Sequence, residues 1–199
     1  MYKSALITGH TKGIGLATAN LLQQNGLEVV GISRKSGHDL SEDYEEAKHF
    51  IIDKNPDIFI NNAYVPQNQT NLLKDVYKAW ETKDKLIINL CSVAALVPLD
   101  HPDYNMPYAL DKRNQKRFCD DINFNYSKVN FTHTKCGLVN LNFDYVKTSF
   151  KSKHDKRLYP NLNPKEVADI IWYAIKSFQS NICFRELSFH STKMPELLT

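Results

Sequence analysis

The sequence predicts an α/β fold in three layers, with a doubly wound parallel sheet between two layers of helices. Residues 4–8 form a short apolar run without alternating polar residues, which is typical of a strand buried on both faces of a parallel sheet. A glycine-rich turn and a segment with apolar residues at helical spacing follow directly. This order of apolar run and helical segment recurs along the chain, which favours parallel strands joined by helices.

Composition fits one globular domain over residues 1–199. Hydrophobic residues make up 42% of the chain and charged residues 24%, and the net charge is +3. That charge is too small and too dispersed for a nucleic-acid-binding surface. No stretch approaches the roughly 18 apolar residues of a membrane span, and a strand that begins near residue 4 leaves no room for a signal peptide. We therefore expect a cytoplasmic protein with no nucleic-acid or membrane partner.

The cysteines and histidines show no metal-binding pattern. Neither the four cysteines nor the seven histidines are spaced as metal ligands usually are. We expect reduced thiols and no metal.

Apolar periodicity and breaker residues place the remaining elements. The expected strands cover residues 4–8, 27–33, 57–60, 85–90, 128–134 and 182–189. The expected helices cover the segment after Gly15, then residues 42–54, 70–82, 105–125 and 163–178, the last opened by a capping box at Asn163 and Glu166. Only a turn fits directly after the second strand, so a helix is missing there and the third strand is vestigial.

The turn after the first strand has the features of a phosphate-binding loop. Side chains at Gly9, Gly13 and Gly15 would hold a diphosphate away from backbone N–H groups and from the positive end of the following helix. The spacing resembles that of the short-chain dehydrogenase/reductase family, over the segment Thr8-Gly9-His10-Thr11-Lys12-Gly13-Ile14-Gly15. The resemblance implies a Rossmann-like fold and an NAD(P)-dependent oxidoreductase that interconverts a carbonyl and an alcohol.

Position in the fold selects the catalytic residues. The pattern Tyr-x-x-x-Lys occurs as Tyr44 with Lys48 and as Tyr108 with Lys112. Only the second pair begins a helix after the strand that leads to Ser92, at the edge where open parallel sheets bind ligands. We expect Tyr108 to be the general acid and base, with its pKa lowered by the charge of Lys112. The resemblance implies that Ser92 donates a hydrogen bond to the substrate oxygen and that Lys112 binds the nicotinamide ribose.

Two features depart from the family pattern. Relatives carry a catalytic asparagine in the helix before the serine-bearing strand, and the candidates here are Asn68 and Asn71. Asp111 stands where relatives have a small residue, and we expect it to face away from Lys112 because adjacent helix positions point about 100° apart.

The end of the second strand predicts NADP rather than NAD. Enzymes selective for NAD place a carboxylate there, whereas this chain has Ser33 and Arg34, and Lys12 is a second cation aimed at the same pocket. The resemblance implies three further contacts with the cofactor. Asp39 and Leu40 would lie against the adenine, Asn62 and Ala63 would border the cofactor, and Gly137 and Val139 would line the nicotinamide. The whole expected cofactor site is Gly9, Thr11, Lys12, Gly13, Ile14, Gly15, Ser33, Arg34, Asp39, Leu40, Asn62, Ala63, Tyr108, Lys112, Gly137 and Val139.

The alternative function is a non-catalytic NADP-binding regulator on the same fold. Intact Ser92, Tyr108 and Lys112 favour the enzyme, and the shortened helices and missing asparagine favour the regulator. The expected partner is a small carbonyl or alcohol, with residues 142–163 as a substrate-side loop whose cluster of basic residues could attract an anionic substrate. Relatives are commonly homodimers or homotetramers.

Overall fold

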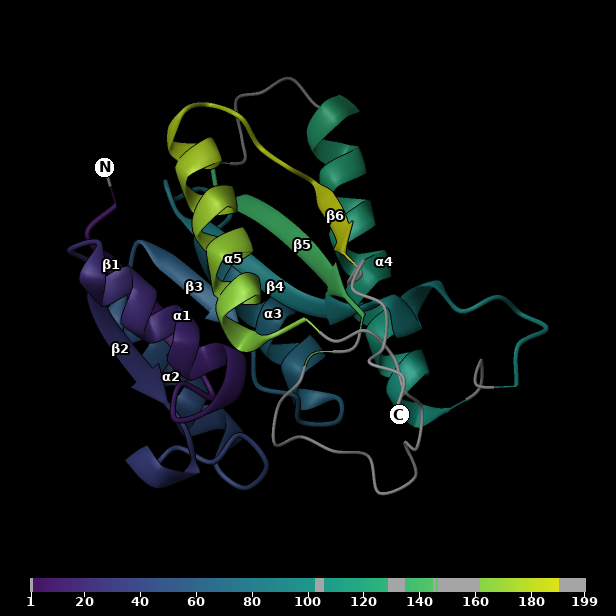
Figure 1. Ribbon diagram of the computed structural model, residues 1–199, viewed down its shortest axis with the longest axis horizontal. Coiled ribbons are helices and arrows are strands. Elements are labelled where there is room, and N and C mark those ends of the chain that lie inside the picture. The colour runs from purple at the N-terminus through teal and green to yellow at the C-terminus, as the bar shows by residue number, and fades with distance from the viewer. Residues whose placement is uncertain (1, 103–105, 129–134, 145, 147–161, 190–199) are drawn as a thin grey trace, which may run out of the picture.

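Six parallel strands form one sheet in the order β2-β1-β3-β4-β5-β6 (Figure 1). The computed structural model describes residues 2–102, 106–128, 135–144, 146 and 162–189. The strands are β1 Ser4–Thr8, β2 Glu28–Ile32, β3 Ile58–Asn61, β4 Leu86–Ser92, β5 Gly137–Phe143 and β6 Glu186–Phe189. The helices are α1 Gly13–Gln24, α2 Tyr44–Lys54, α3 Asn68–Trp80, α4 Pro107–Lys128 and α5 Pro164–Gln179, with short 3-10 turns η1 Arg34–Ser36 and η2 Val93–Leu96.

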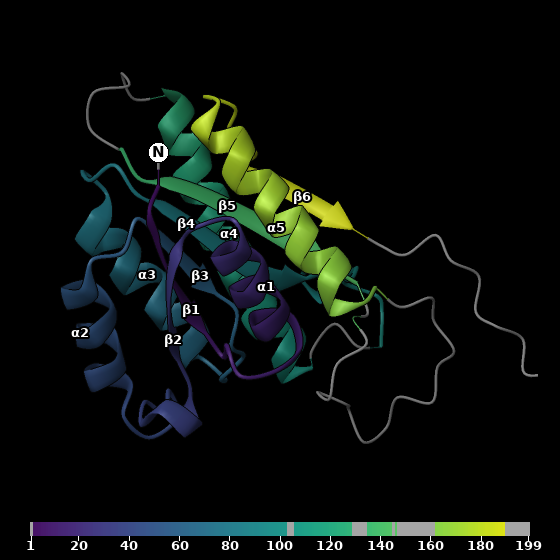
Figure 2. The same cartoon turned by 60° about the vertical axis from the view of Figure 1, so that its left-hand side comes forward.

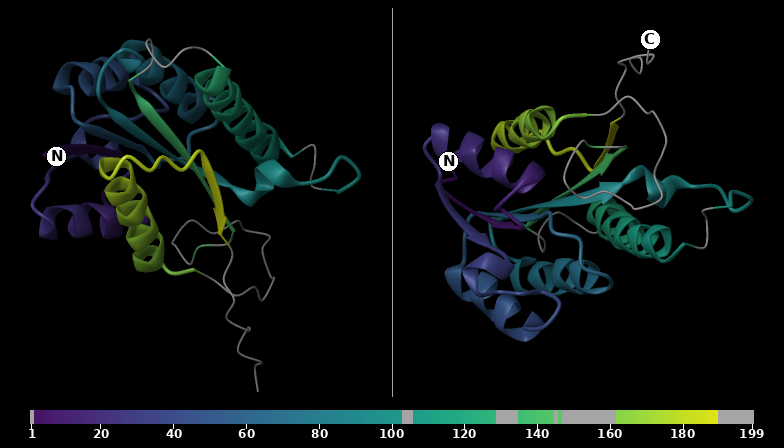
Figure 3. Two further views of the ribbon diagram at one scale, coloured as in Figure 1. Left: turned by 90° about the horizontal axis from the view of Figure 1, so that it is seen from above. Right: turned by 60° about the horizontal axis from the view of Figure 1, so that its bottom comes forward.

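Helices cover both faces of the sheet, which gives the three predicted layers. Helices α1 and α5 pack together on one face, and α2, α3 and α4 lie on the other (Figures 2 and 3). Successive strand residues alternate between the two cores: Ala5 and Ile7 pack under α1 and α5, whereas Leu6 packs with Phe59 and Trp80 on the opposite side. Both faces of the central strands are therefore buried, as the unbroken apolar runs predict.

The chain reverses its direction of winding between β1 and β3. Strand β2 pairs with one side of β1 and β3 with the other. Residues 33–57, all described, form η1 and α2 but no strand. The strand that the sequence analysis called vestigial, between the second strand and the strand at 57–60, is therefore absent. A crevice forms at such a reversal, at the carboxyl ends of the strands.

The strand between β4 and β6 lies later in the chain than the predicted 128–134. Helix α4 continues to Lys128, residues 129–134 lie outside the described part of the chain, and the strand is Gly137–Phe143. All residues of β5 are buried. Asn140 and Asn142 lie in this strand, and buried asparagine is unusual unless its amide has partners.

Those partners form a row of amides across the sheet. Asn61, Asn89 and Asn140 are direct neighbours in the strand register. The amide of Asn61 donates to Asn89 Oδ1 (3.0 Å), that of Asn89 to Asn140 Oδ1 (2.8 Å) and that of Asn140 to Asn142 Oδ1 (3.0 Å). Asn142 in turn donates to Glu186 on β6. These hydrogen bonds therefore offset the free-energy cost of burying four side-chain amides.

The capping signals of the sequence are confirmed. Asn163 Oδ1 accepts from the backbone N–H groups of Lys165 and Glu166 at 3.0 and 2.9 Å, and Glu166 Oε2 accepts from Asn163 N, so α5 begins with the predicted capping box. Gly26 closes α1 with a φ of 83°, in the left-handed region where glycine is favoured.

Candidate active site

The loop after β3 is fastened to the end of β1. The hydroxyl oxygen of Thr8 accepts from the backbone N–H groups of Asn62 (2.9 Å) and Ala63 (2.8 Å), and Asn62 Nδ2 donates to Thr8 O (2.7 Å). Asn62 and Ala63 also lie against Gly9, since a Cβ built there would be 3.1 Å from each. The structure thus brings two predicted cofactor residues from β3 to the glycine loop that follows β1.

The glycine loop folds tightly over the first turn of α1. Gly9 and Gly13 have φ values of 73° and 57°, in the left-handed region. A Cβ on Gly15 would lie 2.3 Å from Gly9 O and 2.9 Å from Asn62 Nδ2, closer than side chains can approach. Lys12 stands at the N-cap of α1 without a side-chain cap, followed by Gly13 and Ile14. This leaves a helix N-terminus bordered by bare backbone, which suits a phosphate group.

The turn after β2 holds Arg34 and a carboxylate, Asp39, that is bonded to Ser41. Arg34 is exposed and begins η1, which Ser33 caps. Asp39 accepts from the hydroxyl and the backbone N–H of Ser41, at 2.6 and 2.9 Å. These two bonds, assisted by the charge of Arg34, lower the pKa of Asp39.

Leu40 and Asn68 meet on the opposite side of that turn. Leu40 is 5% exposed and belongs to the core under α2 and α3. Asn68 Nδ2 donates to Leu40 O at 2.6 Å, and Asn71 is exposed. Neither asparagine proposed from sequence contacts Lys112.

Ser92 and Tyr108 are brought together as predicted. Ser92 ends β4 and caps η2 by accepting from Ala94 N at 3.2 Å. Tyr108 is the second residue of α4, and its phenol is hydrogen-bonded to the Ser92 hydroxyl. Burial raises the pKa of Tyr108 to about 12, against the lowering effect of that bond. The expected lowering of this pKa is wrong for the protein by itself, because desolvation outweighs the hydrogen bond with Ser92.

Lys112 is buried, and the three N–H groups of its ammonium donate hydrogen bonds within the protein. Its Nζ lies 2.7 Å from Gln69 Oε1, 3.2 Å from Leu90 O and 3.3 Å from Gln115 Oε1. An ammonium has three N–H donors, so these acceptors account for all of them. The residue is 2% exposed, and burial lowers its pKa to about 8.

Two aromatic rings lie beside this ammonium. The Nζ atom is 5.3 Å from the ring centroid of Tyr64 and 5.6 Å from that of Tyr108, within the range of cation–π attraction. The two rings pack edge to face, with centroids 4.8 Å apart. Tyr64, which stands where the family pattern has glycine, is therefore part of the site.

Gln69 is the residue that the sequence analysis missed. It is fully buried on α3 and contacts Lys112 directly. Asp111 faces α3 instead, where it accepts from Thr70 Oγ1 (2.7 Å) and Gln67 N (3.1 Å), as expected from its position next to Lys112. A polar residue at the start of a helix that faces the Tyr-x-x-x-Lys helix is the signal that could have identified Gln69.

The other Tyr-x-x-x-Lys pair has a structural role. Tyr44 Oη donates to Asp75 on α3 at 2.8 Å, and Lys48 forms an ion pair with Glu45. Both bonds lie on the surface between α2 and α3, so this pair takes no part in the site.

The placement of Gly137 and Val139 in the crevice is wrong. Gly137 begins β5 and pairs with Leu86, the first residue of β4, whereas Ser92 pairs with Phe143 at the opposite edge. Val139 is fully buried in the core. The described residues that follow β5 at the carboxyl edge are Asp144 and Val146, and Val146 bridges to Leu162. The basic residues expected in the loop, Lys147, Lys151, Lys153, Lys156 and Arg157, lie outside the described residues.

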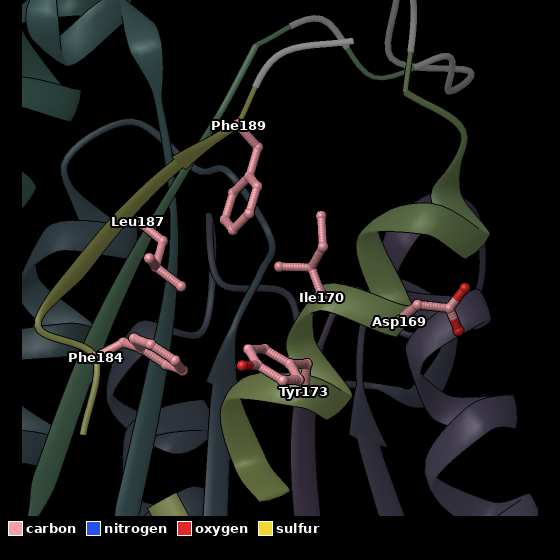
Figure 4. A pocket seen from close by; sticks show the side chains of 6 residues that line it. All are labelled: Asp169, Ile170, Tyr173, Phe184, Leu187 and Phe189. Carbon is pink, nitrogen blue, oxygen red and sulfur yellow. The ribbon is translucent and has the colours of Figure 1, made fainter. Parts of the chain in front are cut away.

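Two surface hollows of the described chain are lined by residues other than Ser92, Tyr108 and Lys112. One, of about 380 Å³, lies between α5 and β6 (Figure 4). Its lining is Asp169, Ile170, Tyr173, Phe184, Leu187 and Phe189. Another, of about 320 Å³, lies along α4 and η2 and is lined by polar and basic residues. Among the described residues, no group of three or more metal-binding side chains gathers and no helix is long and apolar enough to span a membrane.

Comparison with known proteins gives the fold. No family model and no curated protein matches the sequence. A 3-alpha-hydroxysteroid dehydrogenase from Pseudomonas sp. B-0831, solved with NADH, is 18% identical with a TM-score of 0.71, over 94% of each chain. A short chain dehydrogenase from Burkholderia cenocepacia J2315, in complex with NADP, is 16% identical with a TM-score of 0.72, over 95% of this chain and 88% of that one. A 3-ketoacyl-(acyl-carrier-protein) reductase from Brucella melitensis, complexed with NADH, is 19% identical with a TM-score of 0.71, over 94% of this chain and 96% of that one.

Proposed function

We propose that this protein is a short-chain dehydrogenase/reductase that uses NADP(H) to interconvert a carbonyl compound and an alcohol. The observation that supports this most strongly is the hydrogen-bonded pair of Ser92 and Tyr108 next to the ammonium of Lys112. The three residues come from β4 and α4 and meet at the carboxyl edge of the sheet. Hydroxyl, phenol and ammonium together can bind a carbonyl oxygen and exchange a proton with it.

The glycine loop fits the cofactor. The glycine loop packs closely over Gly15, and the start of α1 beside it has no side-chain cap, so exposed backbone N–H groups there suit a diphosphate. Arg34 follows β2 at the place where an NAD-selective enzyme has a carboxylate, and its planar fork suits a 2′-phosphate. Asp39 is the nearby acid, and its carboxylate is bonded to Ser41. The site therefore favours NADP over NAD.

The nicotinamide supplies the hydride. The chain's own residues handle the proton: Ser92 donates a hydrogen bond to the carbonyl oxygen and Tyr108 transfers its phenolic proton to the same oxygen. The hydride on carbon and the proton on oxygen together give the alcohol. Because the pKa of Tyr108 is about 12, the phenol holds its proton at neutral pH and is ready to act as the acid in the reductive direction.

A second candidate is a regulator that binds NADP without turnover. One observation favours it: the ammonium of Lys112 donates three hydrogen bonds inside the protein, and the residue is 2% exposed. A ribose hydroxyl therefore has to displace one of these hydrogen bonds to reach it. The proposed enzyme differs from this regulator only in whether the site opens toward substrate.

The assembly and location belong to the same proposal. Leu110 and Phe124 on α4 are 44% and 55% exposed, and these apolar positions support a homodimer or homotetramer. Cys91, Cys119 and Cys136 are free and buried, which supports a reducing, cytoplasmic location. Light scattering of the purified protein measures the assembly directly.

The test is absorbance of NADPH with purified protein and a panel of aldehydes and ketones. We expect oxidation of NADPH with at least one carbonyl, and a loss of about 10²–10⁴ in turnover for Tyr108→Phe with NADPH affinity unchanged. The matched control is Tyr44→Phe, which alters the other Tyr-x-x-x-Lys pair and leaves turnover intact. Binding of NADPH with no turnover of any carbonyl would favour the regulator.

A further inference from the structure

The carboxamide of Gln69 has one orientation that satisfies its surroundings. Its Nε2 donates to Asn61 O at 3.0 Å and to Leu90 O at 3.2 Å. Its Oε1 accepts from Lys112 Nζ at 2.7 Å. Exchanging the nitrogen and oxygen would place a donor against the ammonium and an acceptor against two carbonyls, so the network fixes the assignment.

This side chain links the elements that form the site. Asn61 ends β3, Leu90 lies near the end of β4, and Lys112 is one turn along α4 from Tyr108. Asn61 Nδ2 also donates to Gln69 O at 3.0 Å, which ties the first turn of α3 to the sheet. A movement of Gln69 therefore moves Lys112 relative to both strand ends.

We propose that Gln69 is the positioning residue for Lys112: its neutral carboxamide holds the ammonium beneath Tyr108, where the acceptors of the described chain are all neutral, an inference that rests on the proposed function. A neutral acceptor orients the ammonium but adds little charge stabilisation, whereas a carboxylate at the same place would keep the lysine charged through the alkaline range. The choice of glutamine makes Lys112 a group whose charge changes close to physiological pH.

Other groups around Lys112 leave that effect in place. Asp111 and the thiol of Cys91 each favour the charged form, and burial outweighs both and lowers the pKa to about 8. Asp111 is itself bonded to Thr70 and to the backbone of Gln67. The rings of Tyr64 and Tyr108 face the ammonium from the β3 loop and from α4.

The test is the titration of Lys112 in the protein alone, followed by NMR of ¹³Cε-labelled lysine and assigned with Lys112→Met. We expect a pKa close to 8 for the wild type. Gln69→Glu should raise the pKa of Lys112 by about 1–3, and Gln69→Leu should lower it, because the first adds an opposite charge and the second removes an acceptor. Gln24→Glu is the control: it makes the same chemical change at an exposed position at the end of α1, on the other face of the sheet, and should leave the titration unchanged.

Opposite shifts of the Lys112 pKa in the two Gln69 variants support the positioning role. A packing defect alone would shift the Lys112 pKa of both variants in the same direction. A wild-type pKa near 10.5, or equal values in wild type and Gln69→Glu, would overturn it. Should Gln69→Leu fail to fold, the Gln69→Glu result decides by itself.

NADPH titrations between pH 7 and pH 10 form the second arm. The pH above which affinity declines should follow the Lys112 pKa of each variant. A wild type that binds no NADPH contradicts the proposed function, while the NMR titration still decides the role of Gln69. Binding whose pH dependence is the same in all variants contradicts the positioning role and leaves the proposed function intact.

Discussion

Gly15→Ala tests whether the loop after β1 holds the cofactor by close backbone approach. The new Cβ would lie 2.3 Å from Gly9 O, whereas ordinary contacts begin at 3.4 Å, so the loop has to open by about 1 Å. Overpacking of this kind costs about 1–3 kcal/mol. For a chain of this size that cost corresponds to a fall of about 2–12 °C in Tm. The displaced loop also moves the backbone N–H groups that would bind phosphate, so NADPH affinity should fall by at least about tenfold, equivalent to about 1.4 kcal/mol.

The matched control is Gly137→Ala, which creates a similar clash far from the crevice. Its Cβ would lie 2.2 Å from the Phe178 ring, at the amino end of β5. We expect a comparable loss of Tm in differential scanning calorimetry, with NADPH affinity unchanged in fluorescence titrations below the transition. A Gly15→Ala protein with wild-type NADPH affinity would refute the reasoning about the loop. Weakened NADPH binding by Gly137→Ala would contradict the position of Gly137 at the amino end of β5, away from the cofactor.

Three further changes probe the cofactor end of the site and the bonds that support it. Arg34→Asp should weaken NADPH binding by at least about tenfold and favour NADH, because a carboxylate repels the 2′-phosphate; unchanged selectivity in paired titrations would contradict the assignment. Thr8→Val should cost about 1–3 kcal/mol in urea unfolding, because two backbone N–H groups lose their acceptor, whereas Thr8→Ser should retain most of the stability. The pKa of Asp57 is lowered in the folded protein: burial opposes the lowering, but hydrogen bonds from Lys3 and Ser4 outweigh it. Asp57 should therefore stabilise the fold above about pH 4 and lose that effect as the pH falls through its lowered pKa. The difference in unfolding free energy between wild type and Asp57→Asn should therefore vanish in acid; a constant difference from pH 7 to pH 2 would exclude this role.

Local signals sufficed where a residue's conformation depends on its near neighbours. The glycine loop, the capping box of α5 and the Tyr108–Lys112 spacing all reflect contacts within a few residues, and the structure has each of them as expected. The general position of Ser92 also followed from sequence, because the carboxyl ends of parallel strands share one edge.

Strand β5 could not be assigned from its own residues. Asn140 is buried with the amide of Asn89 on β4 as its partner, Asn142 donates to Glu186 and Ser188 on β6, and both strands are distant in sequence. Periodicity measures the polarity of a segment, whereas the cost of burying an amide depends on partners that only the assembled sheet provides. The displaced strand in turn misplaced Gly137 and Val139.

The chemistry of the site was likewise divided between sequence and tertiary structure. The sequence alone predicted that Ser92, Tyr108 and Lys112 lie together, since helix spacing and strand order fix their positions. Only the tertiary structure decided their state: burial raises the pKa of Tyr108 and lowers that of Lys112, and Gln69, on a helix more than forty residues earlier, accepts a hydrogen bond from the lysine. Desolvation and long-range hydrogen bonds depend on everything packed around a group, which no local pattern records.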